Sequence, residues 1–351
     1  MKRFLLRKRA QRQLKKAVLM ITALCILATS GCSAKTTESQ EQQEKQTLKL
    51  SMVISSDAPE CVKEAAGEFI NRAAYYSNGE LQISLSESAQ VDSVLQASDT
   101  EFAFVENEQL ISSIEELKTL ELPFFFKNAD YQFSALNTEQ TQYRLNELIA
   151  ELYPMKVQLA TTCGYEDLAA DDSIDLTDFR KRYILAVKES FFPDEIQEDI
   201  GAREIVSDNP LGLLLEEKAE IAQADLSDVI SAVQNPSYTG EMAVLTSTHR
   251  VKTVYLLVND QLMDKLSPSQ QAAVEQAAVM SCGYCRTLAD QKREEELETL
   301  SELGVSVYPV NLEKYYAMMG DIYQYEAEQM LYRPDPQLDR MIRSDGVKET
   351  F

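Results

Sequence analysis

The feature that most constrains the fold is one long helical segment in the C-terminal third of the chain. It begins at Ser267-Pro268-Ser269-Gln270, where Ser is a favourable cap, Pro suits the first helical position and Gln closes a capping box. It runs to Leu303, and Gly304 ends it. At about 1.5 Å per residue, such a helix is about 50 Å long, which exceeds the width of one small domain. We therefore expect this helix to span two lobes.

Strand and helix patterns alternate along the rest of the body. An amphipathic helix is predicted over residues 59–76, and Asn78-Gly79 predicts a turn into the next strand. This order is typical of an α/β fold with largely parallel strands, in which ligands bind at the carboxyl ends of the strands. The predicted strands cover residues 48–54, 81–85, 101–105, 156–161, 183–187, 251–258 and 305–310.

The N-terminal residues have the pattern of an export signal followed by a tether. Eight basic side chains and no acidic one lie within residues 1–16, and an apolar run follows to Ala28. That run is too short to span a membrane and predicts a signal peptide over residues 1–31. The Thr-Ser-Gly-Cys sequence that ends at Cys32 resembles a bacterial lipobox, so we expect this Cys to be lipidated. The alternative is an ordinary signal peptide with an incidental Cys. Residues 32–46 contain few apolar side chains and predict a flexible tether.

Composition excludes several classes of function. With 57 acidic and 34 basic side chains, the net charge of −23 argues against nucleic acid, which proteins bind largely through Lys and Arg. The single histidine, His249, excludes metal centres that need two or three imidazole ligands. The eleven glycines are too widely spaced for a phosphate-binding loop. We therefore expect no metal or other cofactor in a folded body over residues 47–335, which a C-terminal tail over residues 336–351 follows.

Several short segments resemble one family, in the same order along the chain. The LELPFFFKN stretch at residues 120–128 resembles the LPFLF segment of solute receptors for tripartite ATP-independent periplasmic (TRAP) transporters, the C4-dicarboxylate-binding type. The resemblance implies a two-lobed α/β receptor, with lobes that are discontinuous in sequence. Such a receptor closes on a small solute, usually an organic acid, and delivers it to permease subunits without catalysis. The other similar segments are Ser77–Leu81, Asp175-Leu176, Leu245–His249, Val258–Asp260 and Leu266–Pro268.

The departures from the family fall in the expected solute site. The resemblance implies an Arg, on the strand after the family's DLKG segment, that holds the solute carboxylate. An ungapped register puts Arg182 at that position, whereas matching Val187–Ser190 to the family's VPES puts Ala186 there. We prefer the second register, because it keeps the apolar strand intact. A second family Arg becomes Glu166, and the family's Asp-Gly and Asn are lost next to Asp225.

Replacing an Arg by Glu changes attraction for an anion into repulsion. A charge pair about 4 Å apart is worth roughly 1 kcal/mol in water and about 4 kcal/mol near a protein surface. Our hypothesis is therefore that the solute is neutral, cationic or zwitterionic, and that Glu166 and Asp225 face it. The alternative is that both side chains are exposed and the cleft is remodelled or no longer binds a solute.

Two other patterns have both a structural and a functional interpretation. Cys282-Gly283-Tyr284-Cys285 has the CxxC spacing of thiol–disulfide oxidoreductases, but it lies on an apolar face inside the long helix, which favours buried packing. Cys61 and Cys163 are isolated, and their pairing stays open. No nucleophile motif accompanies His249, which favours a structural hydrogen bond over a role as general base.

The leading prediction is an extracytoplasmic, lipid-anchored solute receptor for a TRAP-type permease, and not an enzyme. Its expected partners are a small solute, the permease subunits and the membrane that holds the anchor. An alternative from a different class is a divergent lipoprotein that acts as a sensor or protein-interaction module without a transport ligand. A thiol–disulfide oxidoreductase is the third alternative, and it depends on the CxxC spacing alone.

Overall fold

The computed structural model describes residues 47–97, 100–172, 183–188, 202–238, 240–310, 320 and 335–346. These residues belong to one compact unit that begins at Gln46. The predicted signal peptide and tether, with Cys32, lie outside the described residues, and so does Arg182. In the described part of the chain, every helix is too short or too polar to serve as a membrane span.

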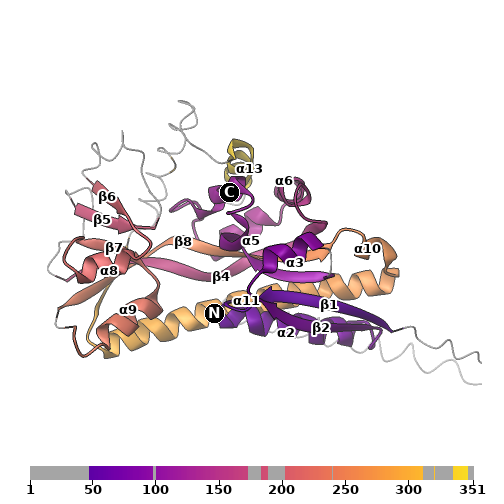
Figure 1. Cartoon of the computed structure of the whole chain (residues 1–351), viewed down its shortest axis with the longest axis horizontal. Helices are drawn as coiled ribbons and strands as arrows, with labels where there is room; N and C mark the ends of the chain where they lie inside the picture. The colour runs from indigo at the N-terminus through magenta and orange to yellow at the C-terminus, as the bar shows by residue number, and fades with distance from the viewer. Residues whose placement is uncertain are drawn as a thin grey trace, which may run out of the picture. The chain divides into compact units, whose positions relative to one another are not determined.

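The strands of the described residues form one mixed sheet of nine strands (Figure 1). Its order is β2-β1-β3-β8-β4-β7-β5-β6, and β9 pairs with β8. The strands are β1 (Leu48–Ser55), β2 (Leu81–Ser88), β3 (Phe102–Glu106), β4 (Met155–Asp171), β5 (Tyr183–Val187), β6 (Ala202–Val206), β7 (Ile221–Ala224), β8 (Met242–Asn259) and β9 (Ser306–Pro309).

Helices connect these strands, which confirms the α/β class. In the first part of the chain they are α2 (Glu60–Tyr76), α3 (Val91–Ala97), α4 (Asn107–Leu110), the 3-10 helix η1 (Glu115–Glu121), α5 (Ala129–Leu136) and α6 (Glu139–Ala150). In the second part they are α8 (Pro210–Leu215), α9 (Leu226–Val233), α10 (Leu262–Lys265), α11 (Pro268–Glu302) and α13 (Pro336–Gly346).

The two ends of the sheet are parallel, and the strands that join them are not. At one end β1 pairs in parallel with β2 and β3, and at the other end β5 pairs in parallel with β6 and β7. Between them β4 and β8 pair antiparallel along most of their length. The expectation of a largely parallel sheet is therefore wrong for its centre. The chain leaves the first lobe (β1–β3 with α2) along β4 and returns from the second lobe (β5–β7 with α8 and α9) along β8, so the two strands run in opposite directions.

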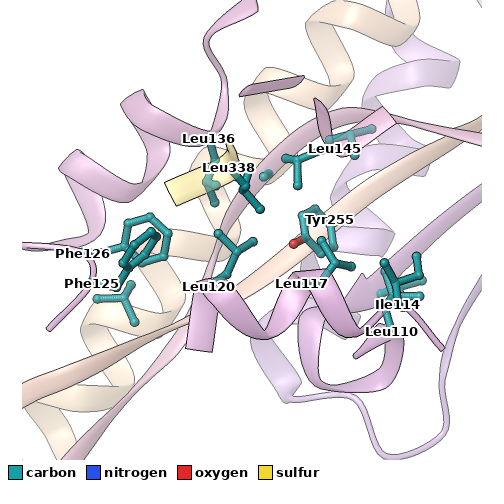
Figure 2. Packing of buried hydrophobic residues seen from close by; sticks show 14 of the residues in the cluster. Leu110, Ile114, Leu117, Leu120, Phe125, Phe126, Leu136, Leu145, Tyr255 and Leu338 are labelled. Atoms are coloured by element: carbon teal, nitrogen blue, oxygen red, sulfur yellow. The ribbon is translucent and has the colours of Figure 1, made fainter. Parts of the chain in front are cut away.

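One apolar cluster lies in the second lobe, and a larger one extends from the first lobe to Leu185, Val187 and Ile221 of β5 and β7. Leu211, Val229 and Val244 belong to the cluster of the second lobe. In the first lobe, Phe125 and Phe126 pack among the side chains that Figure 2 shows. The LPFFF stretch, which carries the family resemblance, thus lies in the apolar core. Burial of such side chains contributes roughly 1.5–3 kcal/mol each.

The C-terminal region departs from the expected tail. Residues 336–346 form α13, which packs against α5 and α6. Leu338 and Ile342 are fully buried in the same cluster as Phe125. Arg144 of α6 also pairs with the buried Asp335 at 2.8 Å, immediately before the helix. The body of the protein therefore includes α13, because its apolar face completes the core of the first lobe.

Helix α11 forms as the sequence predicts and contacts both lobes. Ser267 caps it, and Gln270 closes the capping box. The helix packs along α2 in the first lobe and against α9 and β9 in the second. No residue between Ala289 and Leu300 is fully buried, and in this stretch the partly buried Leu297 packs against the apolar cluster of the second lobe.

Candidate functional site

A cavity of about 240 Å³ lies where the two lobes meet α11. Strands β4 and β8 supply one wall, the start of α9 supplies another, and α11 closes the site. A second hollow, of about 320 Å³, lies within the second lobe beside Tyr238 and does not touch the first lobe. The first cavity is therefore the candidate site. Its long polar side chains are Tyr165, Asp225, Lys252, Lys292, Arg293 and Glu296.

Lys252 connects the cavity wall to the charges behind it. Its Nζ lies 2.7 Å from Asp225 Oδ1 and 3.8 Å from Glu166 Oε1. Burial would lower the pKa of this ammonium group, but Asp225 and Glu166 outweigh burial and raise the pKa above its ordinary value. Lys252 is therefore charged at neutral pH and is paired with an acidic group on each side.

Glu166 is buried, and basic side chains surround it. Lys188 Nζ lies 3.1 Å from its carboxylate, Arg250 Nη1 lies 3.2 Å away, and Gln223 donates a further hydrogen bond. Burial would raise the pKa of this carboxyl group, but Arg250, Lys252 and Lys188 together lower it well below its usual range. Glu166 is thus an ionised group with its own counter-charges.

This environment corrects the repulsion hypothesis for Glu166. The side chain of Glu166 is 1% exposed and lies behind Lys252, not on the cavity wall. Its charge is balanced by three cations, so a solute anion at the wall does not meet an uncompensated carboxylate. An Arg-to-Glu replacement reverses the local field only where no neighbouring charge compensates, and here the neighbours compensate.

Arg293 is fixed by a second buried carboxylate. It forms an ion pair with Asp167, and its Nη2 also donates to Thr248 Oγ1 at 3.1 Å. Its guanidinium carbon lies 5.2 Å from the centre of the Tyr165 ring, within range of a cation–π interaction. Burial raises the pKa of Asp167, and Arg293 opposes that rise. Arg293 is consequently oriented, with its guanidinium held at the cavity wall.

The joining strands are irregular beside this ion pair. Glu166 lies opposite Arg250, but two residues further along β4 Leu168 lies opposite Leu245. Four residues of β8 therefore face a single residue of β4, which makes a bulge at the junction of the lobes. Thr248, inside the bulge, has φ +41°, a conformation that is strained for a β-branched residue. Its N–H donates to Asp167 Oδ1 at 2.7 Å, which holds the bulge in place.

His249 lies in the same bulge and is buried. Its Nδ1 is 2.9 Å from Ser247 Oγ. Burial, only partly offset by Glu166, lowers the pKa of His249 to about 3, so the imidazole is neutral at physiological pH. Both side chains are at most 1% exposed, so no substrate reaches them. The structural interpretation of His249 is confirmed, although the residue lies in the middle of β8 and not at its beginning.

The four candidate solute-binding residues lie in different surroundings. Asp225 lines the cavity, and Glu166 lies behind it. Ala186 is fully buried in the core of the second lobe, where it pairs with Ala222 of β7, so it does not reach the cavity. Arg182 is not among the described residues.

Sequence reasoning missed three residues of the wall: Tyr165, Lys252 and Arg293. Lys252 did have a signal, because it is the one cation in the apolar segment 251–258 that the sequence predicts as a strand. Arg293 lies in a run of charged residues and carries no comparable signal. Its role depends on Asp167, which only the packing of α11 against β4 brings near.

The CxxC thiols do not have the surroundings that thiol–disulfide catalysis needs. Cys282 and Cys285 are fully buried inside α11, and burial raises the pKa of Cys282 to about 12. A catalytic thiol is partly exposed and has a lowered pKa. The packing interpretation of Cys282 is confirmed.

Part of the chain matches the model of a known protein family. Residues 231–329 match the family described as bacterial extracellular solute-binding protein, family 7. None of the curated proteins compared with the chain matches its sequence.

Solved structures with the same fold include two TRAP periplasmic solute-binding proteins and a sugar acid binding protein. One is a TRAP periplasmic solute-binding protein from Ochrobactrum anthropi, with its C-terminus bound in the ligand-binding pocket. Its sequence is 14% identical and its TM-score is 0.69, and the alignment covers 87% of this chain and 96% of that protein. A TRAP periplasmic solute-binding protein from Desulfovibrio desulfuricans with bound sn-glycerol-3-phosphate is 16% identical, with a TM-score of 0.62. The alignment covers 87% of this chain and 98% of that protein. A sugar acid binding protein from Advenella mimigardefordensis in complex with galactonate is 16% identical, with a TM-score of 0.60. The alignment covers 86% of this chain and 99% of that protein. These similarities confirm the two-lobed receptor fold.

Proposed function

We infer that the chain belongs to the TRAP-type solute-binding proteins, and we propose that it is an extracytoplasmic receptor that captures a small solute and delivers it to a TRAP-type permease. The family match over residues 231–329 includes α11, the helix that crosses both lobes. The observation that carries the proposal is the cavity at the junction of the lobes, because its wall combines residues from both lobes and α11. A solute held there contacts both lobes at once and favours their closed arrangement.

The charges of the wall support a zwitterionic solute within this function. Lys252, Lys292 and Arg293 offer cations, and Asp225 and Glu296 offer carboxylates. Each of these cations already has an acidic partner, with Asp167 behind the wall as the partner of Arg293, so none is left uncompensated to select a simple anion. A solute with one carboxylate and one ammonium group is able to pair with both signs. The relatives with bound sn-glycerol-3-phosphate and galactonate make a simple organic anion the competing proposal.

The test is thermal unfolding of the purified protein with matched sets of three solutes. Each set contains an amino acid, the hydroxy acid that lacks its ammonium group and the amine that lacks its carboxylate, for example glutamate, 2-hydroxyglutarate and 4-aminobutyrate. A ligand at 100 times its dissociation constant stabilises the folded state by about 2.7 kcal/mol. We expect stabilisation by members of the amino-acid group alone. Stabilisation by hydroxy acids alone would establish an anion receptor, and no stabilisation by a broad solute library would favour the sensor or interaction module.

The location outside the cell membrane is also part of the proposal. The signal peptide and the lipidated Cys32 are sequence predictions that lie outside the described residues. Labelling cells with an alkyne-bearing fatty acid tests them. We expect the protein to carry the label, and we expect Cys32→Ala to lose it and to leave the membrane fraction. Equal labelling of both proteins would contradict lipidation at this residue.

A further inference from the structure

Arg293 is the most firmly held of the three cations on the cavity wall. Its side chain is 17% exposed, and both of its Nη atoms pair with Asp167. Nη2 also donates to Thr248 Oγ1 at 3.1 Å, and the centre of the Tyr165 ring lies 5.2 Å from the guanidinium carbon. The hydroxyl of Tyr165 donates in turn to Asp290 on α11, which fixes the ring. The orientation of Arg293 is thus set before a solute arrives.

These contacts leave part of the guanidinium available. A guanidinium has five N–H donors and no acceptor. Asp167 accepts one N–H from each Nη atom, and Thr248 accepts the second N–H of Nη2. Among the described residues, no hydrogen bond uses the Nε–H or the second N–H of Nη1. Because Arg293 lines the cavity, these donors are able to bind an acceptor atom of a solute.

The surroundings of these donors select the kind of acceptor. The N–H groups lie in the guanidinium plane, and Tyr165 covers one face of that plane, so an acceptor approaches at the edge. A carboxylate oxygen suits this edge, because charge-assisted hydrogen bonds are about twice as strong as neutral ones. The charge of Arg293 is already balanced by Asp167, which disfavours a doubly charged group such as a phosphate monoester. The edge therefore fits a single carboxylate on a solute without net charge.

The other expected carboxylate ligands are less suited to this role. The ammonium group of Lys252 lies 2.7 Å from Asp225 and 3.8 Å from Glu166, between two carboxylates of the protein. The side chain of Lys292 is 58% exposed, so water competes for its donors. The strand position that the family resemblance implies is Ala186, which has no side-chain donor and is buried in the core of the second lobe.

We propose that Arg293 binds the carboxylate group of the solute, and that Asp167 and Thr248 position it for this role. The inference rests on the proposed function and orients the solute within the cavity. The ammonium group of the solute then faces Asp225, whose carboxylate does not cap α9. Among the described residues only Oδ1 of Asp225 is paired, with Lys252. The carboxylate ligand thus comes from the helix that contacts both lobes, and not from a strand of the second lobe.

The first test uses acetate, the simplest organic carboxylate, so the natural solute need not be known. The full chain is prepared with isotope-labelled arginine, and Arg293→Lys identifies the Nε–H signal of Arg293 in the NMR spectrum. We expect acetate to shift this signal saturably, and we expect acetamide, which has no charge, to leave it in place. The matched control is Arg286, which lies on α11 outside the cavity and pairs with the exposed Asp130. An equal shift at Arg286, no shift at Arg293, or the absence of a resolved Arg293 signal would overturn the proposal.

The second test is titration calorimetry with the amino acids that stabilise the wild type and with their carboxamides. A carboxamide keeps the ammonium group and loses the negative charge of the carboxylate. The wild type should bind the amino acid about tenfold more tightly than its carboxamide, as expected for the loss of one charge-assisted hydrogen bond. Arg293→Lys should lose this preference, because Lys has no planar set of donors, and Thr248→Val should reduce it. Arg286→Lys should keep it. The wild-type preference in Arg293→Lys would overturn the proposal.

The two tests separate this inference from the receptor proposal. A saturable acetate shift at Arg293 without binding of any amino acid would refute the zwitterionic solute and would support Arg293 as a carboxylate ligand. Amino-acid binding that is equally tight in the wild type and in Arg293→Lys would refute the role of Arg293 and leave the receptor proposal in place.

Discussion

Two stretches of helix α11 behave differently although they belong to one continuous helix. From Ala273 to Ala289 its buried face consists mainly of small residues that pack closely on α2 and the sheet. From Asp290 to Thr299 none of its residues is buried, and Lys292, Arg293 and Glu296 face the cavity. The first stretch packs closely, whereas the second forms the ion pairs of Lys292 and Arg293 and packs only the partly buried Leu297 against the second lobe. The candidate site is thus built on a helix that the core already anchors.

The largest effect is expected from Arg293→Met in the second stretch. This change leaves Asp167, whose side chain is 1% exposed, without its counter-charge. Removing one partner of a buried ion pair costs about 3–5 kcal/mol. Urea denaturation measures this loss. The matched control is Lys292→Met, because its ion pair with Glu296 is more exposed and worth less than about 1 kcal/mol. The double variant with Arg293→Met and Asp167→Asn should recover part of the lost stability, because the unpaired carboxylate is removed. Equal losses of stability in Arg293→Met and Lys292→Met would refute the role of the buried pair.

The next effect is a pH dependence at His249. Its pKa is about 3 in the folded protein and about 6.5 in an unfolded chain. Between these values the unfolded state binds more protons, so stability falls as the pH falls below 6.5, by about 2–3 kcal/mol down to pH 4.5.

Urea denaturation of the wild type and of His249→Gln at pH 7.0, 6.0, 5.0 and 4.5 isolates this contribution. Other titrating groups, such as Glu121 and Asp167, whose pKa values burial raises, are common to both proteins and cancel in the difference. The stability difference between the two proteins should shrink as the pH falls. Parallel pH curves would show that His249 is not buried in its neutral form.

Enlarging a small residue in the packed stretch should cost somewhat less. Ala277 is fully buried between α11 and the first lobe, so Ala277→Leu forces the helix away from its neighbours and costs about 1–3 kcal/mol. Glu294→Leu introduces a leucine at an exposed position between Asp290 and Thr299. It should change the free energy of unfolding by no more than about 0.5 kcal/mol relative to the wild type. Chemical denaturation compares the two, and a similar cost at both positions would remove the contrast between the stretches.

The smallest effect concerns the solute and not the fold. Asp225 is partly exposed and pairs with Lys252, so Asp225→Asn should change stability by less than about 1 kcal/mol. It removes a carboxylate that the proposed zwitterionic solute uses, which should weaken amino-acid binding by roughly tenfold, or about 1.4 kcal/mol. Isothermal titration calorimetry measures this, and the matching hydroxy acid serves as control. Unchanged amino-acid affinity would exclude Asp225 from the site.

The long strands β4 and β8 show which part of a strand the sequence pattern predicts and which part it misses. The predicted strands at residues 156–161 and 251–258 are real, but each is only a part of β4 or β8. The strands continue through Glu166 and Arg250, where buried charges and register shifts interrupt the alternation on which strand prediction depends. The irregular part is also where the lobes meet, so the pattern fails at the place that forms the candidate site.

The length and caps of α11, the order of strands and helices, and the family resemblance could be read from the chain alone, since they depend on local chemistry and spacing. The state of Glu166 could not, because its partners Lys188, Gln223 and Arg250 come from other segments. Their approach depends on the register of β4 against its neighbouring strands, and one bulge in that register changes which charges meet. Whether a buried carboxylate repels a solute or merely balances its neighbours is therefore a property of the folded protein.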